Sequence, residues 1–230
     1  MEKCGVVLVG FCIFARNLQN YKNYPLMKKI MLIACLLLAS VGIYAQHAKG
    51  SFNIQPKLGL NVATMTNNDG SDPRVGFVGG AEFEYQATDL LSLSFGALYS
   101  QQGVKASDEG LDGTIKMDYI NVPVLLNVYV AKGLAVKTGI QPGFKVNSKV
   151  KASTSGVSAE VDLEKAFQAA GVDASVKSVD FAIPVGLSYE YRNFQLDARY
   201  NFSVSKAIEA EGESTKHSVF QFTIGYKFDL

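Results

Sequence analysis

The amino-acid sequence predicts an all-β fold: an eight-stranded antiparallel transmembrane β-barrel, preceded by a cleaved N-terminal signal peptide. Three observations lead to this prediction. A secretory leader lies near the start of the chain, eight later segments alternate apolar with polar residues, and the connections between those segments are alternately long and short. Together these features are typical of barrels that cross a membrane with strands.

The leader is a complete secretory signal. From Met27 the chain reads MKKIMLIACLLLASVGIYAQ, with two lysines, an apolar run over residues 30–41, and small residues that end at Ala45. This is the order of n-region, h-region and cleavage site. The run is also shorter than the roughly 20 residues that a spanning helix needs. We therefore predict cleavage after Ala45.

The leader divides the chain into three parts. Residues 1–26 indicate a translation start assigned too far upstream, with a genuine extended leader as the alternative. Residues 27–45 are the signal peptide, and residues 46–230 form the outer-membrane barrel domain. The three cysteines all precede the cleavage point, so no disulfide framework is available to the barrel. These cysteines are Cys4, Cys12 and Cys35.

Charge and hydropathy narrow the choice of partners. The first 46 residues hold five of the 22 basic residues and one of the 21 acidic ones, which leaves the remainder a formal net charge of −3. This balance argues against nucleic acid as a partner. No later segment is apolar for long enough to be a transmembrane helix. Insertion into a membrane would therefore require a closed barrel, which satisfies every backbone group in lipid.

Eight segments show the two-residue period of barrel strands. They are residues 54–64, 75–87, 90–101, 115–130, 134–144, 179–190, 194–202 and 219–230. The segment 194–202 is the most regular, because FxLxAxYxF alternates with the polar residues QxDxRxN. A soluble barrel of the lipocalin type could show a similar alternation, so the connections must decide between the two classes.

The connections alternate between long and short along the whole chain. In order they are residues 65–74, 88–89, 102–114, 131–133, 145–178, 191–193 and 203–218. Every short turn therefore falls at one rim and every long loop at the other. Outer-membrane barrels have this asymmetry, with short turns in the periplasm and long loops outside the cell.

Two local features of the strands and loops call for a separate interpretation. Pro123 and Pro184 cannot donate to a strand ladder, so we expect a bulge at each. In the longest loop, the apolar residues of segment 161–171 have helical spacing. We expect a helix that packs on the rim of the barrel, and an element that docks a partner is the alternative.

Several strand sequences carry a family resemblance. The segments YINVPVLLNVYV, VDFAIPVGLSYEY, LDARYNF and FTIGYKF, together with the signal peptide, resemble the PorT-like outer-membrane β-barrel family of Bacteroidota. The resemblance implies outer-membrane lipid as surroundings and insertion by the barrel-assembly machinery. It also suggests a protein partner in the cell envelope, since PorT is linked to protein secretion. The chain ends on Leu230, with Phe228 two residues before it, whereas a terminal aromatic residue is more typical.

On each strand, the polar positions that alternate with the apolar ones would face the lumen, and several of them are charged. An eight-stranded barrel is just wide enough for side chains to fill it. We therefore expect a buried ionic network, with Lys57 paired to Glu84 across the first two strands, and a conduction path is the alternative. The predicted lumen residues are Lys57, Glu82, Glu84, Lys137, Asp180, Glu190, Asp197, Arg199 and Lys227.

The sequence offers no catalytic, cofactor-binding or metal-binding residues that we would select, and we predict no cofactor and no enzyme activity. After the leader there are two histidines, His47 and His217, which are too few for a zinc site. Ser214 and Glu213 near His217 could form a triad, as in acyltransferases at the barrel rim, but triads are recognised by geometry. The sequence therefore favours a barrel with structural or protein-interaction roles over a narrow channel or transporter, and over a lipid acyltransferase.

Overall fold

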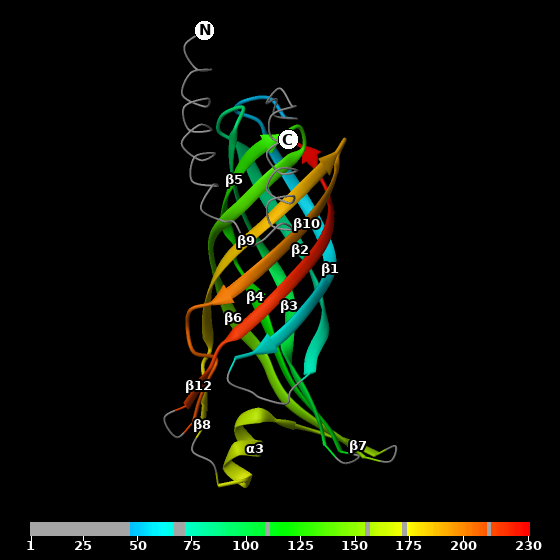
Figure 1. Cartoon of the computed structure of the whole chain (residues 1–230), viewed down its shortest axis with the longest axis vertical. Helices are drawn as coiled ribbons and strands as arrows, with labels where there is room; N and C mark the ends of the chain where they lie inside the picture. The colour runs from blue at the N-terminus through cyan, green and yellow to red at the C-terminus, as the bar shows by residue number, and fades with distance from the viewer. Residues whose placement is uncertain (1–46, 67–71, 109–110, 155–156, 172–173, 211–212) are drawn as a thin grey trace, which may run out of the picture. The chain divides into compact units, whose positions relative to one another are not determined.

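The computed structural model describes residues 47–66, 72–108, 111–154, 157–171, 174–210 and 213–230, which form a closed antiparallel β-barrel (Figure 1). The wall has eight strands, and the last of them pairs with the first. They are β1 (Phe52–Met65), β2 (Asp72–Gln86), β3 (Leu91–Asp108), a fourth strand divided into β4 (Leu111–Asn121) and β5 (Val124–Ala131), β6 (Leu134–Thr154), β9 (Val179–Tyr191), β10 (Phe194–Ser203) and β13 (His217–Tyr226). The predicted eight-stranded antiparallel barrel is confirmed, and the predicted signal peptide lies outside the described residues.

Short turns join the strands at one end of the barrel, which we call the turn rim. Residues 132–133 join β5 to β6, residues 192–193 join β9 to β10, and residues 87–90 join β2 to β3. Gly133 has a φ of 74°, a conformation that glycine adopts without a clash from a Cβ atom. The C-terminal strand β14 (Phe228–Asp229) pairs with β1 at the same rim. The opposite end is the loop rim.

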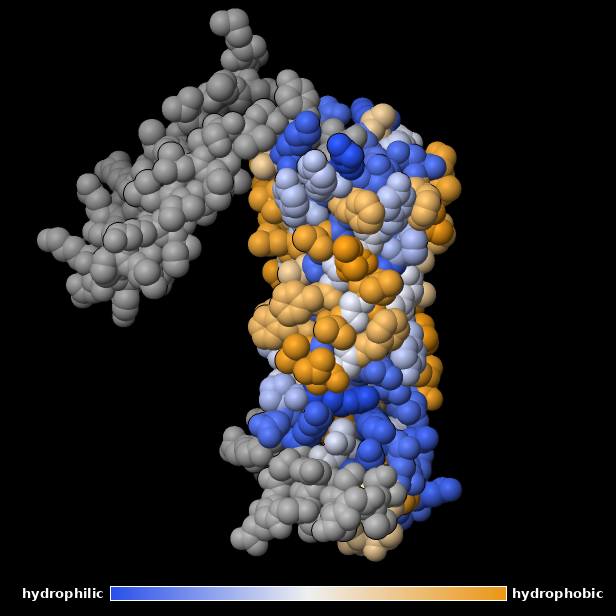
Figure 2. All heavy atoms as spheres, turned by 90° about the vertical axis from the view of Figure 1, so that its right-hand side faces the viewer, coloured by the Kyte–Doolittle hydropathy of each residue, from blue (hydrophilic) through white to orange (hydrophobic). Residues whose placement is uncertain are grey.

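The two faces of the wall have opposite chemistry. In β10, Asp197 and Arg199 point inward and are 4% and 2% exposed, whereas their neighbours Phe194 and Leu196 point outward and are 54% and 57% exposed. On the face shown in Figure 2, apolar side chains gather over the middle of the wall, and polar side chains gather toward the loop rim. Such an outer surface is stable in contact with lipid, and the polar residues then fill the interior.

No helix in the described part of the chain is both long and apolar enough to cross a membrane.

The two prolines interrupt their ladders without producing bulges, so that expectation was wrong. At Pro123 the fourth strand divides into β4 and β5, yet the register with β3 and with β6 is the same on both sides of the proline. The pairing with β6 shifts elsewhere, between Asp118 and Tyr119 and between Tyr129 and Ala131. Pro184 lies inside β9, where the pairing with β6 is interrupted. The register is the same on both sides of this interruption. A missing N–H removes a hydrogen bond, but neighbouring bonds on both sides hold the strands in line.

The long connections between the wall strands contain ordered strands over much of their length, where we had expected loops. Strands β3, β4 and β6 run on past the loop rim, and β7 (Val157–Asp162) pairs back onto β6. Three short strands, β8 (Ala174–Val176), β11 (Ile208–Ala210) and β12 (Glu213–Thr215), form a separate small sheet. These elements gather beyond the loop rim in Figure 1.

The predicted helix is present but shorter than segment 161–171. Helix α3 (Leu163–Ala169) begins after Asp162, whose carboxylate accepts a hydrogen bond from the amide of Glu164. Leu163 is fully buried in an apolar cluster at the loop end of the barrel, so α3 packs on the rim. The buried members of this cluster are Met65, Val104, Met117, Tyr119, Leu163, Val176 and Ile208.

Candidate functional site: the charged interior of the barrel

The structure places all nine predicted charged residues inside the barrel. Each is at most 6% exposed. Eight of them form two clusters at different heights. The ninth, Asp180, lies apart and accepts hydrogen bonds from the hydroxyls of Ser203 and Ser205, at 2.7 and 2.6 Å. A buried charge is costly unless it is paired and hydrogen-bonded, so the pairing within each cluster decides its stability.

The central cluster consists of Lys57, Glu82, Lys137, Asp197 and Arg199. Arg199 Nη2 lies 2.6 Å from Glu82, and its Nε donates to Asp197 at 2.6 Å. Lys57 Nζ lies 2.6 Å from Glu82. Lys137 Nζ lies 3.0 Å from Asp197. These five side chains come from β1, β2, β6 and β10 and carry three positive and two negative charges, so they join opposite sides of the wall across the lumen.

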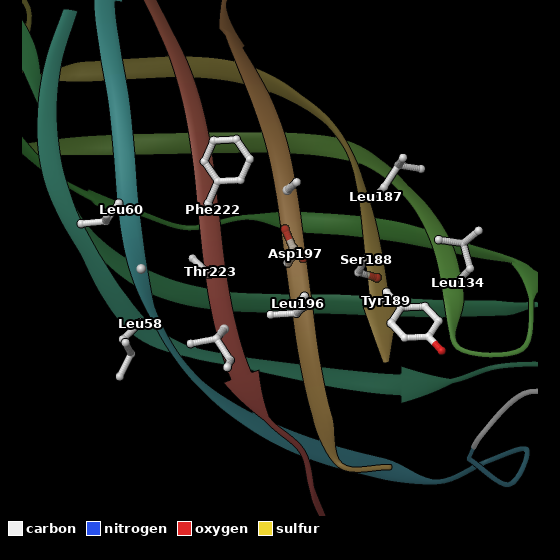
Figure 3. Close-up of a pocket in the computed structure, with 13 residues that line it drawn as sticks. Leu58, Leu60, Leu134, Leu187, Ser188, Tyr189, Leu196, Asp197, Phe222 and Thr223 are labelled. Carbon is white, nitrogen blue, oxygen red and sulfur yellow. The ribbon is translucent and has the colours of Figure 1, made fainter. Parts of the chain in front are cut away.

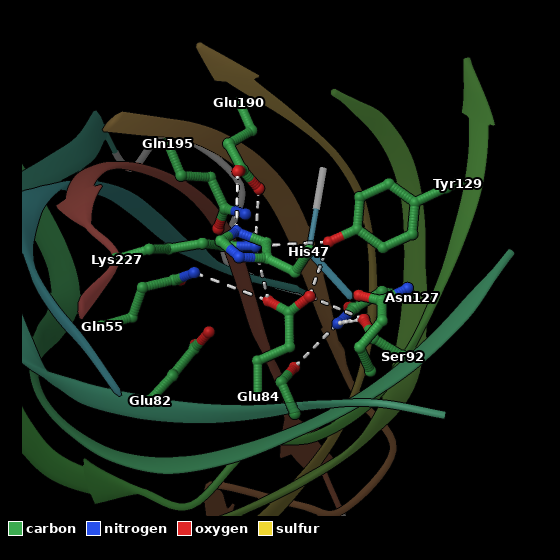
Figure 4. A network of polar contacts seen from close by, with 12 residues as sticks. His47, Gln55, Glu82, Glu84, Ser92, Asn127, Tyr129, Glu190, Gln195 and Lys227 are labelled. Carbon is green, nitrogen blue, oxygen red and sulfur yellow. Dashed lines mark hydrogen bonds and ion pairs between the residues drawn. The ribbon is translucent and has the colours of Figure 1, made fainter. Parts of the chain in front are cut away.

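The rim cluster lies nearer the turn rim and consists of His47, Glu84, Tyr129, Glu190 and Lys227 (Figure 4). Lys227 Nζ lies 2.7 Å from Glu190 and 3.0 Å from Glu84. The hydroxyl of Tyr129 donates to Glu84 at 2.6 Å. The cluster therefore connects the end of β13 with β2, β5 and β9.

The expected pairing of Lys57 with Glu84 was wrong. In the register of β1 and β2, Lys57 lies opposite Gly80, so Glu82 is two residues away along β2 and Glu84 is four. Equal distance from the strand ends does not give equal height in a barrel, because tilted strands are staggered against one another. Lys57 accordingly reaches Glu82, and Glu84 is left for Lys227.

His47 is the member of the rim cluster that the sequence did not reveal. Its Nε2 lies 2.9 Å from Glu190, and its Nδ1 lies 2.8 Å from the exposed carboxylate of Asp229. The hydrogen bond to Glu190 raises the pKa of His47 above its ordinary value of 6.5, and partial burial opposes this rise. His47 precedes the first strand, outside the two-residue pattern, so periodicity gave no signal for it.

The other histidine lies inside the barrel near the loop rim. His217 is 2% exposed, and its Nε2 is 3.1 Å from the hydroxyl of Tyr119. The side chains of Ser214 and Glu213, its supposed triad partners, lie outside the described side chains. Within the described residues, no group of three or more His, Cys, Asp or Glu side chains could hold a metal ion.

A shallow apolar groove with a volume of about 530 Å³ lies on the outer wall (Figure 3). It lies over β1, β13, β10 and β9, where Ala198 is flanked by the larger Phe222 and Leu187. The groove lies on the outward face, and its floor includes the strand residues Ser188, Asp197 and Thr223, whose side chains are buried. Its lining includes Leu58, Leu60, Leu134, Tyr189, Leu196 and Ile224.

Comparison with known proteins identifies the family. The model of the outer membrane protein beta-barrel domain matches residues 44–209, well over half of the chain. The chain belongs to this family. Its location is therefore the bacterial outer membrane, as predicted, and the apolar band of the wall faces lipid. A search of curated proteins found no match.

Several solved outer-membrane barrels are similar to this member of the family. Ail of Yersinia pestis is 18% identical, with 79% of this chain and 100% of that chain covered and a TM-score of 0.41. Neisserial surface protein A is 14% identical, with 78% and 100% covered and a TM-score of 0.43. OprG of Pseudomonas aeruginosa is 15% identical, with 79% and 97% covered and a TM-score of 0.41.

Proposed function

We propose that this outer-membrane barrel is a sealed scaffold, which holds its ordered loop rim at the cell surface for a protein partner. The observation that carries the proposal is the central cluster. Three cations and two carboxylates from four strands meet across the lumen at distances of 2.6 to 3.4 Å. Long side chains that are paired in this way fill the interior of a narrow barrel and leave no room for a solute path.

The loop rim supports the second half of the proposal. Strands that run past the rim, α3 and the small sheet surround an apolar cluster of their own. A set of ordered elements of this kind goes beyond what closing the barrel requires, and rigid scaffolds commonly carry binding residues on such connections. Since outer-membrane barrels have short turns in the periplasm, the loop rim would face outward.

We further infer a place in the PorT-like branch of Bacteroidota outer-membrane barrels, on the strand motifs around Pro123 and Pro184. This inference includes insertion by the barrel-assembly machinery. It also makes a protein of the cell envelope, with a role in secretion, the first partner to test. A narrow channel and a rim acyltransferase are the functions that this proposal competes with.

The test begins with the topology. An epitope tag inserted at Gly156, outside the described residues, should bind antibody on whole cells. A matched tag at Lys132, in the turn between β5 and β6, should bind only after the outer membrane is opened. The tagged protein is then cross-linked in intact outer membranes and purified. Labelling at Lys132 on whole cells would overturn the orientation, and recovery of the barrel without any envelope protein would overturn the scaffold role.

A further inference from the structure

Two rows of apolar side chains line the groove on the outer wall (Figure 3). Each row runs across the strands, because its members are register partners on neighbouring strands. One row is Leu60, Phe222, Ala198 and Leu187, and the other is Leu58, Ile224, Leu196, Tyr189 and Leu134. Ala198 has the smallest side chain of its row, so the wall is hollowed there.

The groove reaches from the middle of the wall to the turn rim. Leu58 and Leu60 lie in the middle of β1, whereas Leu134 is the first residue of β6 and follows the turn at residues 132–133. Barrel strands are tilted against the membrane normal, so a row that crosses them climbs the wall at a slant. An acyl chain that enters the groove at the turn rim can therefore follow it toward the middle of the bilayer.

Aromatic residues mark the turn-rim end of the groove. Tyr189 and Tyr191 point outward from β9 and are 50% and 62% exposed, and Phe194 of β10 is 54% exposed. Such residues gather at the level of the lipid headgroups. The guanidinium carbon of Arg192 lies 5.6 Å from the centre of the Tyr191 ring. A positive charge therefore lies on the outer surface at headgroup level, next to the end of the groove.

The charge of Arg192 is available to an anion. Within the described residues, Arg192 forms no ion pair. The acids at the flanking strand ends do not compensate it, because Glu190 points into the lumen and Asp229 pairs with His47. Lys132 is exposed in the turn between β5 and β6, which the pairing of β6 with β9 places beside the turn of Arg192. This second cation adds to the positive potential.

We propose that the groove holds an acyl chain of one anionic phospholipid, whose phosphate Arg192 binds. This protein belongs to an outer-membrane family, so the occupant of a groove on its outward face is a membrane lipid. Arginine matches a phosphate group with two parallel hydrogen bonds. The inference goes beyond the proposed scaffold role. Only the leaflet depends on that proposal, since turns in the periplasm place the end of the groove among phospholipids.

The chain contains no tryptophan, so a single tryptophan placed in the groove reports on the lipid beside it. Leu60→Trp is the groove reporter, and Phe95→Trp, at an outward position on β3 outside the groove, is the matched reporter. The barrel purified from outer membranes is inserted into phosphatidylcholine vesicles with increasing amounts of phosphatidylglycerol that carries brominated acyl chains. Bromine quenches the fluorescence of a nearby tryptophan.

A lipid site and general contact with the bilayer give different quenching curves. The Leu60→Trp reporter should need about fivefold less phosphatidylglycerol than the Phe95→Trp reporter. The reason is that a cation at a membrane surface contributes about 1 kcal/mol, and a factor of ten corresponds to about 1.4 kcal/mol. At the Phe95→Trp reporter, brominated phosphatidylglycerol and brominated phosphatidylcholine should quench equally.

Two variants in the Leu60→Trp background test the two parts of the site. Arg192→Asn removes the charge and keeps the turn, since asparagine adopts the positive φ of 56° found at this position. Ala198→Phe fills the groove. Each should abolish the preference for phosphatidylglycerol. The controls are Lys149→Asn, beyond the loop rim, and Ala97→Phe, on the outward face of β3, and both should leave the preference unchanged.

Three results would overturn the inference. One is equal quenching curves at the two reporters, and another is a preference that survives Arg192→Asn. The third is quenching of the groove reporter that weakens as the number of barrels per vesicle rises, which would make a second copy of this chain the occupant. None of these results affects the scaffold proposal.

Two further outcomes are decided separately. If Ala198→Phe does not migrate on gels as a folded barrel, Arg192→Asn still tests the site. If the tag at Lys132 binds antibody on whole cells, the turn rim lies at the cell surface, and a phospholipid of the periplasmic leaflet is overturned as the occupant together with the proposed orientation.

Discussion

The ammonium nitrogen of Lys227 lies 2.7 Å from a carboxylate oxygen of Glu190. The two residues are 37 positions apart in the chain, yet only β10 separates the end of β13 from β9 in the wall. The same nitrogen is 3.0 Å from Glu84 of β2. One buried cation thus serves two carboxylates from different parts of the wall, and no other cation in the rim cluster reaches Glu84.

The loss of this cation should strongly destabilise the barrel. Lys227→Met keeps most of the side-chain volume but leaves Glu84 and Glu190 without their ammonium partner, and breaking a buried pair typically costs about 3 to 5 kcal/mol. Urea titration in lipid vesicles should show this loss in the free energy of unfolding. Lys132→Met, at an exposed position on the turn rim, should change it by less than about 0.5 kcal/mol. Equal effects of the two substitutions would contradict the role of Lys227.

The pairing of Lys57 can be measured by a double-mutant cycle. Lys57→Met and Glu82→Gln should show a coupling energy within the range of about 0.5 to 3 kcal/mol that contacting residues give. The parallel cycle of Lys57→Met with Glu84→Gln should show a clearly smaller value, since Glu84 pairs with Lys227. A larger coupling to Glu84 would mean that the register of β1 and β2 is incorrect.

His47 should make the stability of the barrel depend on pH. Its folded-state pKa is raised, mainly by the hydrogen bond to Glu190, so the protonated ring favours the folded state. This contribution is fully present below the unfolded-state pKa near 6.5 and is lost as the pH rises through the folded-state pKa. His47→Gln should therefore destabilise the barrel most at pH 5.5 and least at pH 9. A difference between the two proteins that does not vary with pH would rule out this linkage.

The sequence predicted the strands and the inward phase well because both depend on a local two-residue period. Arg199 is charged and is stable only toward the lumen, whereas Leu196 is apolar and is stable toward lipid. The orientation of β10 in the wall follows directly from this alternation. Partner choice depends on strand stagger, which no local pattern encodes. This is why Glu84 was assigned to Lys57 and not to Lys227. His47 lies before the first strand, and only the closed barrel brings it to Glu190.

Conductance measurements test whether the central cluster seals the lumen. The wild-type barrel in a planar lipid bilayer should show no persistent ion current, because Arg199 and Lys57 are both bound to Glu82 across the lumen. Replacing both by serine removes two long side chains and two positive charges. Glu82 and Asp197 then face Lys137 alone, so the local charge becomes −1, and any current through the variant should favour cations over anions.

Folding of the variant is checked first, by its heat-modifiable migration on gels, so that a failure to insert is not mistaken for a sealed lumen. The matched control, Lys149→Ser with Lys151→Ser, removes the same charge from the outer face of the β6–β7 hairpin and should remain silent. A steady current through the wild-type protein, unchanged by the double replacement at Lys57 and Arg199, would show that ions bypass the central cluster. The scaffold proposal would then give way to a channel.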